Sequence, residues 1–195
     1  MSNQVITAAE RYKLGLAELE LMVRATEQEV VAGNNSSPLL TSNINFFTKS
    51  FLISLCAHIE MCVKEIVFVI AKDIDERAKA ASIPPALIEW RYGVKKKPDV
   101  PNNLSLEIGM TRKEVDDLVS GNVYRTKEAL ACVGIDLAKD KVNWETWKEL
   151  IQTIVKRRNN IVHHDDDASD LSLGDVRKYI ESAQGYIDFI VTACR

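Results

Sequence analysis

The segment from Ser42 to Ala80 restricts the fold more than any other part of the chain. Apolar residues recur in it at helical spacing, and they fall on two faces rather than one. Phe47, Phe51, Leu55, Cys62, Ile66 and Val69 mark the first face, and Ile53, Ala57, Val63, Val67 and Ile70 mark the second. Because a helix with two apolar faces is packed on more than one side, the pattern predicts a long central helix of a bundle.

The rest of the chain also shows helical periodicity and no convincing strand alternation. We predict further helices at about 5–31, 83–92, 111–120, 122–132, 144–162 and 172–195. The segment Ser172–Asp175 is expected to cap the last helix, whose predicted inner face comprises Val176, Ile180, Ala183, Ile187 and Ile190. Thr111 with Glu114 forms a capping-box pattern, and Asn143 is expected to cap the helix that starts at Trp144. The apolar stripe of that helix comprises Trp147, Ile151, Ile154, Val155, Ile161 and Val162. We therefore expect an all-α helical bundle with long central helices and a short-helix insertion.

The length of 195 residues suits a single domain, in which 42–195 forms the core. Residues 1–40 are expected to form a helix and loop, either within the bundle or as an appended arm. The net charge of -3 argues against a protein that coats DNA, although it permits one local basic patch.

Cysteine usage and hydropathy point to the compartment. The four cysteines form no CxxC pair, which indicates structural thiols in a reducing environment. The most apolar stretch, 52–71, has spanning length but contains His58, Glu60, Lys64 and Glu65. Those groups would be costly in lipid, so a buried helix is expected rather than a membrane span. No signal-peptide pattern is visible, and we expect a cytoplasmic protein.

Two charged residues occupy positions where the apolar stripes predict large apolar side chains. Arg158 lies four residues after Ile154, and Glu60 lies within the second face of 42–80. An unpaired charge is costly to bury, so each must reach water, an opposite charge or a bound anion. One hypothesis is that Glu60 and Arg158 pair across the bundle and orient the guanidinium. The alternative is that each has a different partner or lies at an exposed margin.

Arg158 and His163 are separated by five positions, which corresponds to about 140° around a regular helix. The two side chains would therefore not share a face, whereas Asn159 and His163 would. Either the helix ends at Val162 and frees His163, or a second subunit brings its own copy alongside. The polar run Asp165–Asp167 favours a helix end there.

The segment from Arg158 to Asp165, RNNIVHHD, resembles the RxxxxH signature of HEPN domains. In that superfamily the residue after the Arg is commonly Asn, Asp or His, and Asn159 fits. The upstream segment 57–65, AHIEMCVKE, resembles the first core helix of the RiboL-PSP-like HEPN branch. The likeness covers about 46–195, and leaves the first 40 residues and the 95–103 loop unexplained.

The resemblance implies a metal-independent endoribonuclease without a cofactor, working as a homodimer whose two motifs line one cleft. It also implies a toxin–antitoxin or antiviral setting, and an antitoxin or regulatory protein as a further partner. The catalytic residues would be Arg158 and His163, with Asn159, Glu60 and His164 in support. A histidine that titrates near neutrality can move the proton of an RNA 2′-hydroxyl, and a guanidinium can stabilise charge on phosphoryl oxygens. Lys156 and Arg157 would attract the RNA backbone, unless they merely form a solvated helix end.

Two other functions fit the same residues. His163, His164 and Asp165–Asp167 could be metal ligands of a helical phosphohydrolase, although the chain has only one other histidine, His58. The negative charge of the acidic run would repel a phosphate, which is an objection to the nuclease. An alternative role for Asp165 is to orient His163 or His164. The second alternative is a non-catalytic HEPN-like module for dimerisation or sensing. The presence of both motif residues favours an enzyme.

Overall fold

The computed structural model describes residues 2–32, 37–93, 106–164 and 170–195, with only the backbone at Ser2 and His164. The elements, in chain order, are α1 (Ser2–Val31), α2 (Pro38–Ser42), α3 (Ile44–Ala80), α4 (Pro85–Tyr92), α5 (Arg112–Leu118), α6 (Val123–Cys132), a 3-10 helix (Leu137–Lys139), α7 (Lys141–His164) and α8 (Leu173–Ala193). No strand occurs in these ranges. The protein is an all-α bundle, which confirms the predicted fold class.

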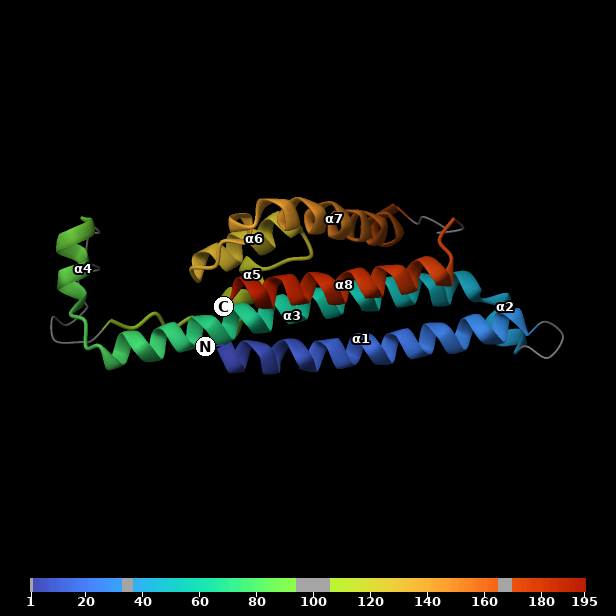
Figure 1. Ribbon diagram of the computed structural model, residues 1–195, viewed down its shortest axis with the longest axis horizontal. Helices are drawn as coiled ribbons and strands as arrows, with labels where there is room; N and C mark the ends of the chain where they lie inside the picture. Colours follow the sequence, from blue (N-terminus) through green and yellow to red (C-terminus); the bar gives the residue numbers. More distant parts are fainter. Residues whose placement is uncertain (1, 33–36, 94–105, 165–169) are drawn as a thin grey trace.

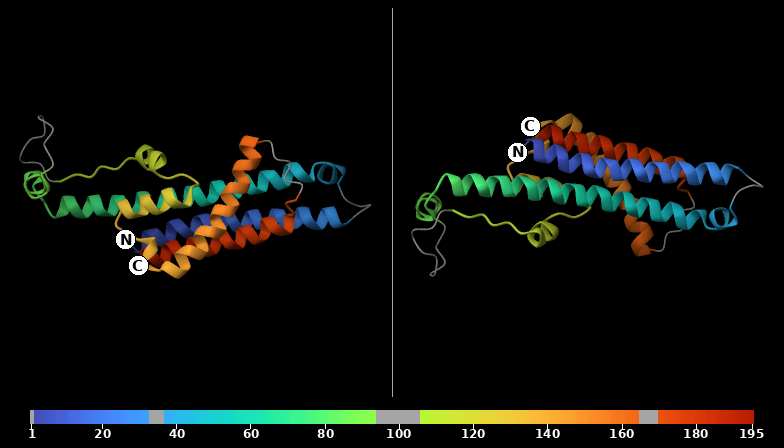
Figure 2. Two further views of the ribbon diagram at one scale, coloured as in Figure 1. Left: turned by 90° about the horizontal axis from the view of Figure 1, so that it is seen from above. Right: turned by 90° about the horizontal axis from the view of Figure 1, so that it is seen from below.

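The helices α1, α3 and α8 run side by side along the long axis, and α7 lies obliquely across α3 and α8 (Figures 1 and 2). The short helix α6 packs against α7 and α3, and α5 packs against α6 and α3. The helix α4 stands beyond the bundle at the far end of α3, and none of its residues is buried. The crossing of α7 over α3 is the feature that positions the candidate site.

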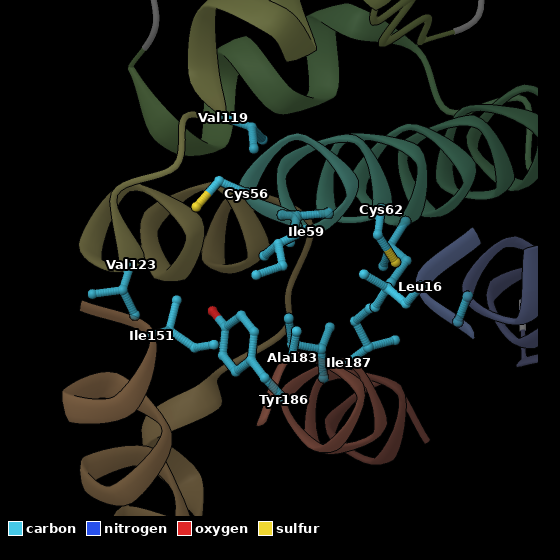
Figure 3. Close-up of a cluster of buried hydrophobic side chains, with 14 of the residues drawn as sticks. Leu16, Cys56, Ile59, Cys62, Val119, Val123, Ile151, Ala183, Tyr186 and Ile187 are labelled. Carbon is cyan, nitrogen blue, oxygen red and sulfur yellow. The ribbon is translucent and has the colours of Figure 1, made fainter. Parts of the chain in front are cut away.

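The core lies where the long helices meet. Side chains from α1, α3, α7 and α8 point toward one another there, with Tyr186 between Ile151 and Ala183 (Figure 3). Leu16 and Leu19 of α1 are buried in the same cluster, so this helix packs fully against the bundle. The predicted inner face of α8 is confirmed, because Val176, Ile180, Ala183, Ile187 and Ile190 are all fully buried.

The two predicted apolar faces of α3 are buried unequally. Val63, Val67 and Ile70 of the second face are buried, but Ile53 is 39% exposed and Ala57 is also exposed. The expectation of burial was therefore wrong for Ile53 and Ala57. The reason is tertiary, since α7 crosses α3 obliquely and covers only part of its length (Figure 2).

Local capping agrees with the prediction at α5 and α8 and differs at α7. Capping boxes at Thr111–Glu114 and Ser172–Asp175 are formed, and Asn122 caps α6. At α7, however, Asn143 lies inside the helix, because the helix starts at Lys141. The backbone N–H of Asn143 donates to Asp140 Oδ1 at 3.2 Å. The aspartate ahead of the helix therefore accepts from the first turn, and α7 starts earlier than predicted.

Ion pairs to one carboxylate of α3 connect this helix to α1 and α5. Glu65 of α3 accepts two hydrogen bonds from Arg112 of α5, at 2.6 and 3.2 Å, and lies 3.8 Å from Arg11 of α1. The hydrogen bonds from Arg112 lower the pKa of Glu65 below its usual range. The same guanidinium lies 4.2 Å from the ring centroid of Phe68, which adds a cation–π contact.

The four cysteines are unbridged, and burial raises the pKa of Cys56 and of Cys62 to about 12. Buried thiols of high pKa are unreactive and pack as small apolar side chains. In the described ranges, no helix is both long enough and apolar enough to cross a membrane.

Candidate active site

Arg158 and His163 lie on one unbroken helix, because α7 continues to His164. The alternative in which the helix ends at Val162 and frees His163 is therefore not the one observed. Five residues of regular helix separate the two side chains by about 140° around the axis. One protomer therefore presents the guanidinium and the imidazole on different faces, and the arrangement in which a second copy of the chain supplies the other residue stays a prediction.

Arg158 occupies the inner face of α7, as its spacing predicts. It follows Ile154, which is 1% exposed, by one turn, and it is itself partly buried. Its Nη1 donates to Asn159 Oδ1 at 2.9 Å, whereas its Nε is buried without a hydrogen-bond partner. Among the described residues, no carboxylate lies within 4.0 Å of the guanidinium. Arg158 therefore retains donors and a charge that no described side chain neutralises.

Glu60 of α3 forms its ion pair with a residue other than Arg158. Its Oε1 is 2.8 Å from Lys64 Nζ, which also lies 3.2 Å from Asp116. Both Arg158 and Glu60 are close enough to Cys56 to influence its thiol: burial raises the pKa, Arg158 lowers it and Glu60 raises it. The two charges thus face one region of the bundle without forming an ion pair with each other. The alternative that Glu60 has a different partner is the one observed.

His163 is exposed, one turn beyond Asn159 on the same face of α7. That face also carries Lys156, which is exposed and helps to line a pocket with Asn159. Arg157 points to another side, where its guanidinium pairs with Asp170 just before α8. The structure thus brings Lys156, Asn159 and His163 together and holds Arg157 apart. The side chain of His164 lies outside the described residues.

The pocket beside Asn159 has a volume of about 200 Å³ and lies between the start of α6 and α7. Its other walls include Asn122 and Gln152, which the sequence reasoning did not single out. Gln152 precedes Lys156 by four positions and Asn159 by seven, so helical periodicity from the motif could have identified it. Asn122 could not have been found in this way, because only the packing of α6 on α7 brings it there.

The hypothesis of a metal site finds no support among the described residues, where no group of three or more His, Cys, Asp or Glu side chains is placed to hold an ion. Asp165–Asp167, on which that reading depends, lie outside it. His58 is a partly buried residue whose Nδ1 is 2.8 Å from the Ser54 carbonyl. Its ring lies against Gly15 of α1, where a Cβ would come within 2.8 Å of Nε2.

Comparison with known protein families identifies a match. The family described as RiboL-PSP-HEPN matches residues 27–195, which include α3, α7 and the whole Arg158–His163 motif. No curated protein and no solved structure matches the chain. HEPN domains are all-α and are often ribonucleases that bind RNA and dimerise. The chain therefore belongs to the RiboL-PSP-HEPN family.

Proposed function

We propose that the protein is a metal-independent endoribonuclease that cleaves single-stranded RNA through attack by a 2′-hydroxyl. The observation that carries the proposal is the state of Arg158. Its side chain lies on the inner face of α7, its Nε is buried without a partner, and no described carboxylate neutralises it. An unpaired guanidinium in such a position is costly, and a bound phosphate would satisfy both its charge and its free donors.

The reaction needs one proton acceptor, one proton donor and stabilisation of the phosphoryl oxygens. The 2′-oxygen attacks phosphorus while its proton passes to a His163 imidazole. The bond from phosphorus to the 5′-oxygen breaks, and that oxygen takes up a proton from a water molecule, whose hydroxide is neutralised by the proton that the imidazole gained. The products are a 2′,3′-cyclic phosphate and a 5′-hydroxyl. Arg158 stabilises the negative charge that grows on the two non-bridging oxygens.

A composite site between two protomers resolves the separation of the motif residues around α7. Val162 follows Arg158 by one turn on the same face, yet it is 47% exposed, although the sequence predicted it as part of the buried stripe. The apolar stripe of α7 therefore continues past the bundle. In the proposed homodimer, two α7 ends pack through these surfaces, and Arg158 of one protomer lies near His163 of the partner subunit.

The first test is cleavage of single-stranded RNA by the purified protein in the presence of EDTA, with the product ends identified as cyclic phosphates. Arg158→Ala and His163→Ala are each expected to abolish cleavage without lowering the melting temperature. Arg24→Ala, which removes an exposed arginine of α1 bonded to Glu20, is the matched control and retains activity. Cleavage that requires a divalent cation, or that survives Arg158→Ala, would contradict the proposal.

The composite site has its own test, in which the two inactive variants are mixed and allowed to exchange subunits. A heterodimer of Arg158→Ala with His163→Ala contains one intact site, because each protomer supplies the residue that the other lacks. Random exchange should restore about a quarter of wild-type activity. A site built within one protomer would give no recovery.

A second candidate function is a non-catalytic HEPN module for dimerisation or sensing. The observation that favours it is the unbroken helix between Arg158 and His163, which keeps them on different faces of each protomer. This alternative predicts a stable dimer, no cleavage in either metal or EDTA, and no recovery on mixing the variants.

A further inference from the structure

The pocket beside the motif combines apolar walls with polar side chains. Val123 and Val155 supply the apolar walls. Asn122, Gln152, Lys156 and Asn159 supply the polar groups. Asn159 precedes His163 by one turn, a rise of about 6 Å along α7. A ligand in the pocket would therefore lie about one helical turn from the exposed His163.

Two of these amides are held with their oxygens turned to protein donors. Asn122 Oδ1 accepts from the backbone N–H groups of Tyr124, at 2.8 Å, and Arg125, at 3.4 Å, because it caps α6. Asn159 Oδ1 accepts from Arg158, whose guanidinium can only donate. Both lone pairs of Asn122 Oδ1 and one of Asn159 Oδ1 are therefore engaged, and no described residue accepts a hydrogen bond from either NH2 group. With the Lys156 ammonium, three of the four polar side chains present donors.

The walls of the pocket favour a base over a phosphate, and its size suits a single small group. Its volume of about 200 Å³ is below the range of roughly 300–1,000 Å³ of cavities for drug-sized ligands. Val123 is buried and Val155 is partly buried, so two sides of the pocket offer no hydrogen bond to a charged ligand. A flat heterocycle can contact these apolar side chains with its face and the donors with its edge.

We propose that this pocket binds one base of the RNA, next to the nucleotide that is cut, and prefers keto bases to amino bases. Uracil and guanine carry a carbonyl acceptor where cytosine and adenine carry an amino donor. Donors of fixed orientation pair with the carbonyl and oppose the amino group. The inference rests on RNA being the substrate at the Arg158–His163 site, and it adds Asn122 and Gln152 as determinants of specificity.

The test uses 2′-fluoro oligouridine and oligocytidine, which lack the attacking hydroxyl and so measure binding without cleavage. The two probes differ in the group that the pocket is proposed to read. By fluorescence anisotropy the wild-type protein should bind oligouridine about tenfold more tightly than oligocytidine. Equal affinities would overturn the proposal, and would be the result if the pocket held only phosphate.

Asn122→Asp is the decisive variant, because aspartate caps a helix as well as asparagine does. The oxygen that caps α6 is kept, while the NH2 donor is replaced by an acceptor. The preference for oligouridine should fall about tenfold or reverse, with an unchanged melting temperature. Gln152→Ala should also reduce the preference. Gln28→Ala, an exposed residue of α1, is the control and should leave it as in the wild type. A preference that is unchanged in Asn122→Asp would refute the assignment.

The experiments distinguish a failure of the base-pocket proposal from a failure of the nuclease proposal. Cleavage of ordinary RNA without any preference between uridine and cytidine would leave the nuclease and remove the base pocket. Discrimination between the fluorinated probes, sensitive to Asn122→Asp but without cleavage of ordinary RNA, would leave the pocket and remove the nuclease.

Discussion

Arg158 carries a charge at a position that the fold would fill with an apolar side chain. Its neighbours along the inner face of α7, Ile151 and Ile154, are each 1% exposed, and its own Nε is buried without a partner. Asn159 satisfies one guanidinium nitrogen at 2.9 Å. A residue that costs stability where it stands is expected at a functional site rather than in a structural core.

The residue-scale prediction follows from this cost. Arg158→Leu should increase the free energy of unfolding by about 1–4 kcal/mol, because an apolar side chain replaces an uncompensated, partly buried charge. The same variant should lose RNA cleavage. Urea unfolding followed by circular dichroism measures the first effect.

Arg24→Leu is the comparison, since its exposed position makes a change beyond about 0.5 kcal/mol unexpected. A clear loss of stability in Arg158→Leu would show that the arginine has a structural partner, and would weaken the case for a phosphate.

Close packing between helices depends on a few small residues. Gly185 lies inside α8, and the Trp147 ring of α7 lies directly over it, so that a Cβ at this position would overlap the ring. Elsewhere in a helix alanine is preferred to glycine by roughly 1 kcal/mol. Here the close approach of α7 and α8 reverses that preference, and the position of the whole of α7 depends on it.

At the scale of the elements, we predict that Gly185→Ala destabilises the protein by about 1–3 kcal/mol through overpacking against Trp147. Thermal unfolding monitored by tryptophan fluorescence would measure it. Gly174→Ala, also in α8, is the control, because its Cβ would meet only atoms at 3.6 Å. That variant should be neutral or slightly more stable. A neutral Gly185→Ala would contradict the observed packing of α7 on α8.

The arrangement of the whole molecule leaves part of α7 without cover. The helix crosses the layer of long helices obliquely (Figure 2), and the apolar face that holds Ile154 and Arg158 reaches Val162 at 47% exposure. The opposite end of the same helix exposes another valine, Val142, at 78%. Only Val162 continues the face of α7 that carries Arg158, which is why it is the proposed contact between protomers.

For the whole molecule we therefore predict a dimer that depends on Val162. Light scattering after size exclusion should give twice the monomer mass of 21.9 kDa. Val162→Arg should give the monomer, because it places a charge in the proposed apolar contact. Val142→Arg should remain dimeric. If Val162→Arg is dimeric as well, the two protomers associate through another surface and the composite site is not formed in this way.

The helices themselves followed from the sequence, because periodicity and capping act within a few residues. The long α3, the capping box at Thr111 and the inner face of α8 were all predicted before any long-range contact was known. The unusual position of Arg158 followed as well, since it required only its spacing from Ile154. The resemblance to HEPN domains came from the same local pattern, and the match over residues 27–195 shows the family.

The tertiary structure decided what those helices touch. The packing of α6 on α7 determines that Asn122 comes beside Gln152. The angle at which α7 crosses α3 determines whether Arg158 reaches a carboxylate and whether Val162 is covered. That angle is set by packing between residues far apart in the chain, such as Trp147 against Gly185. Spacing along one helix places residues on a face, but only the packing of a second helix determines whether that face becomes core, pocket or open surface.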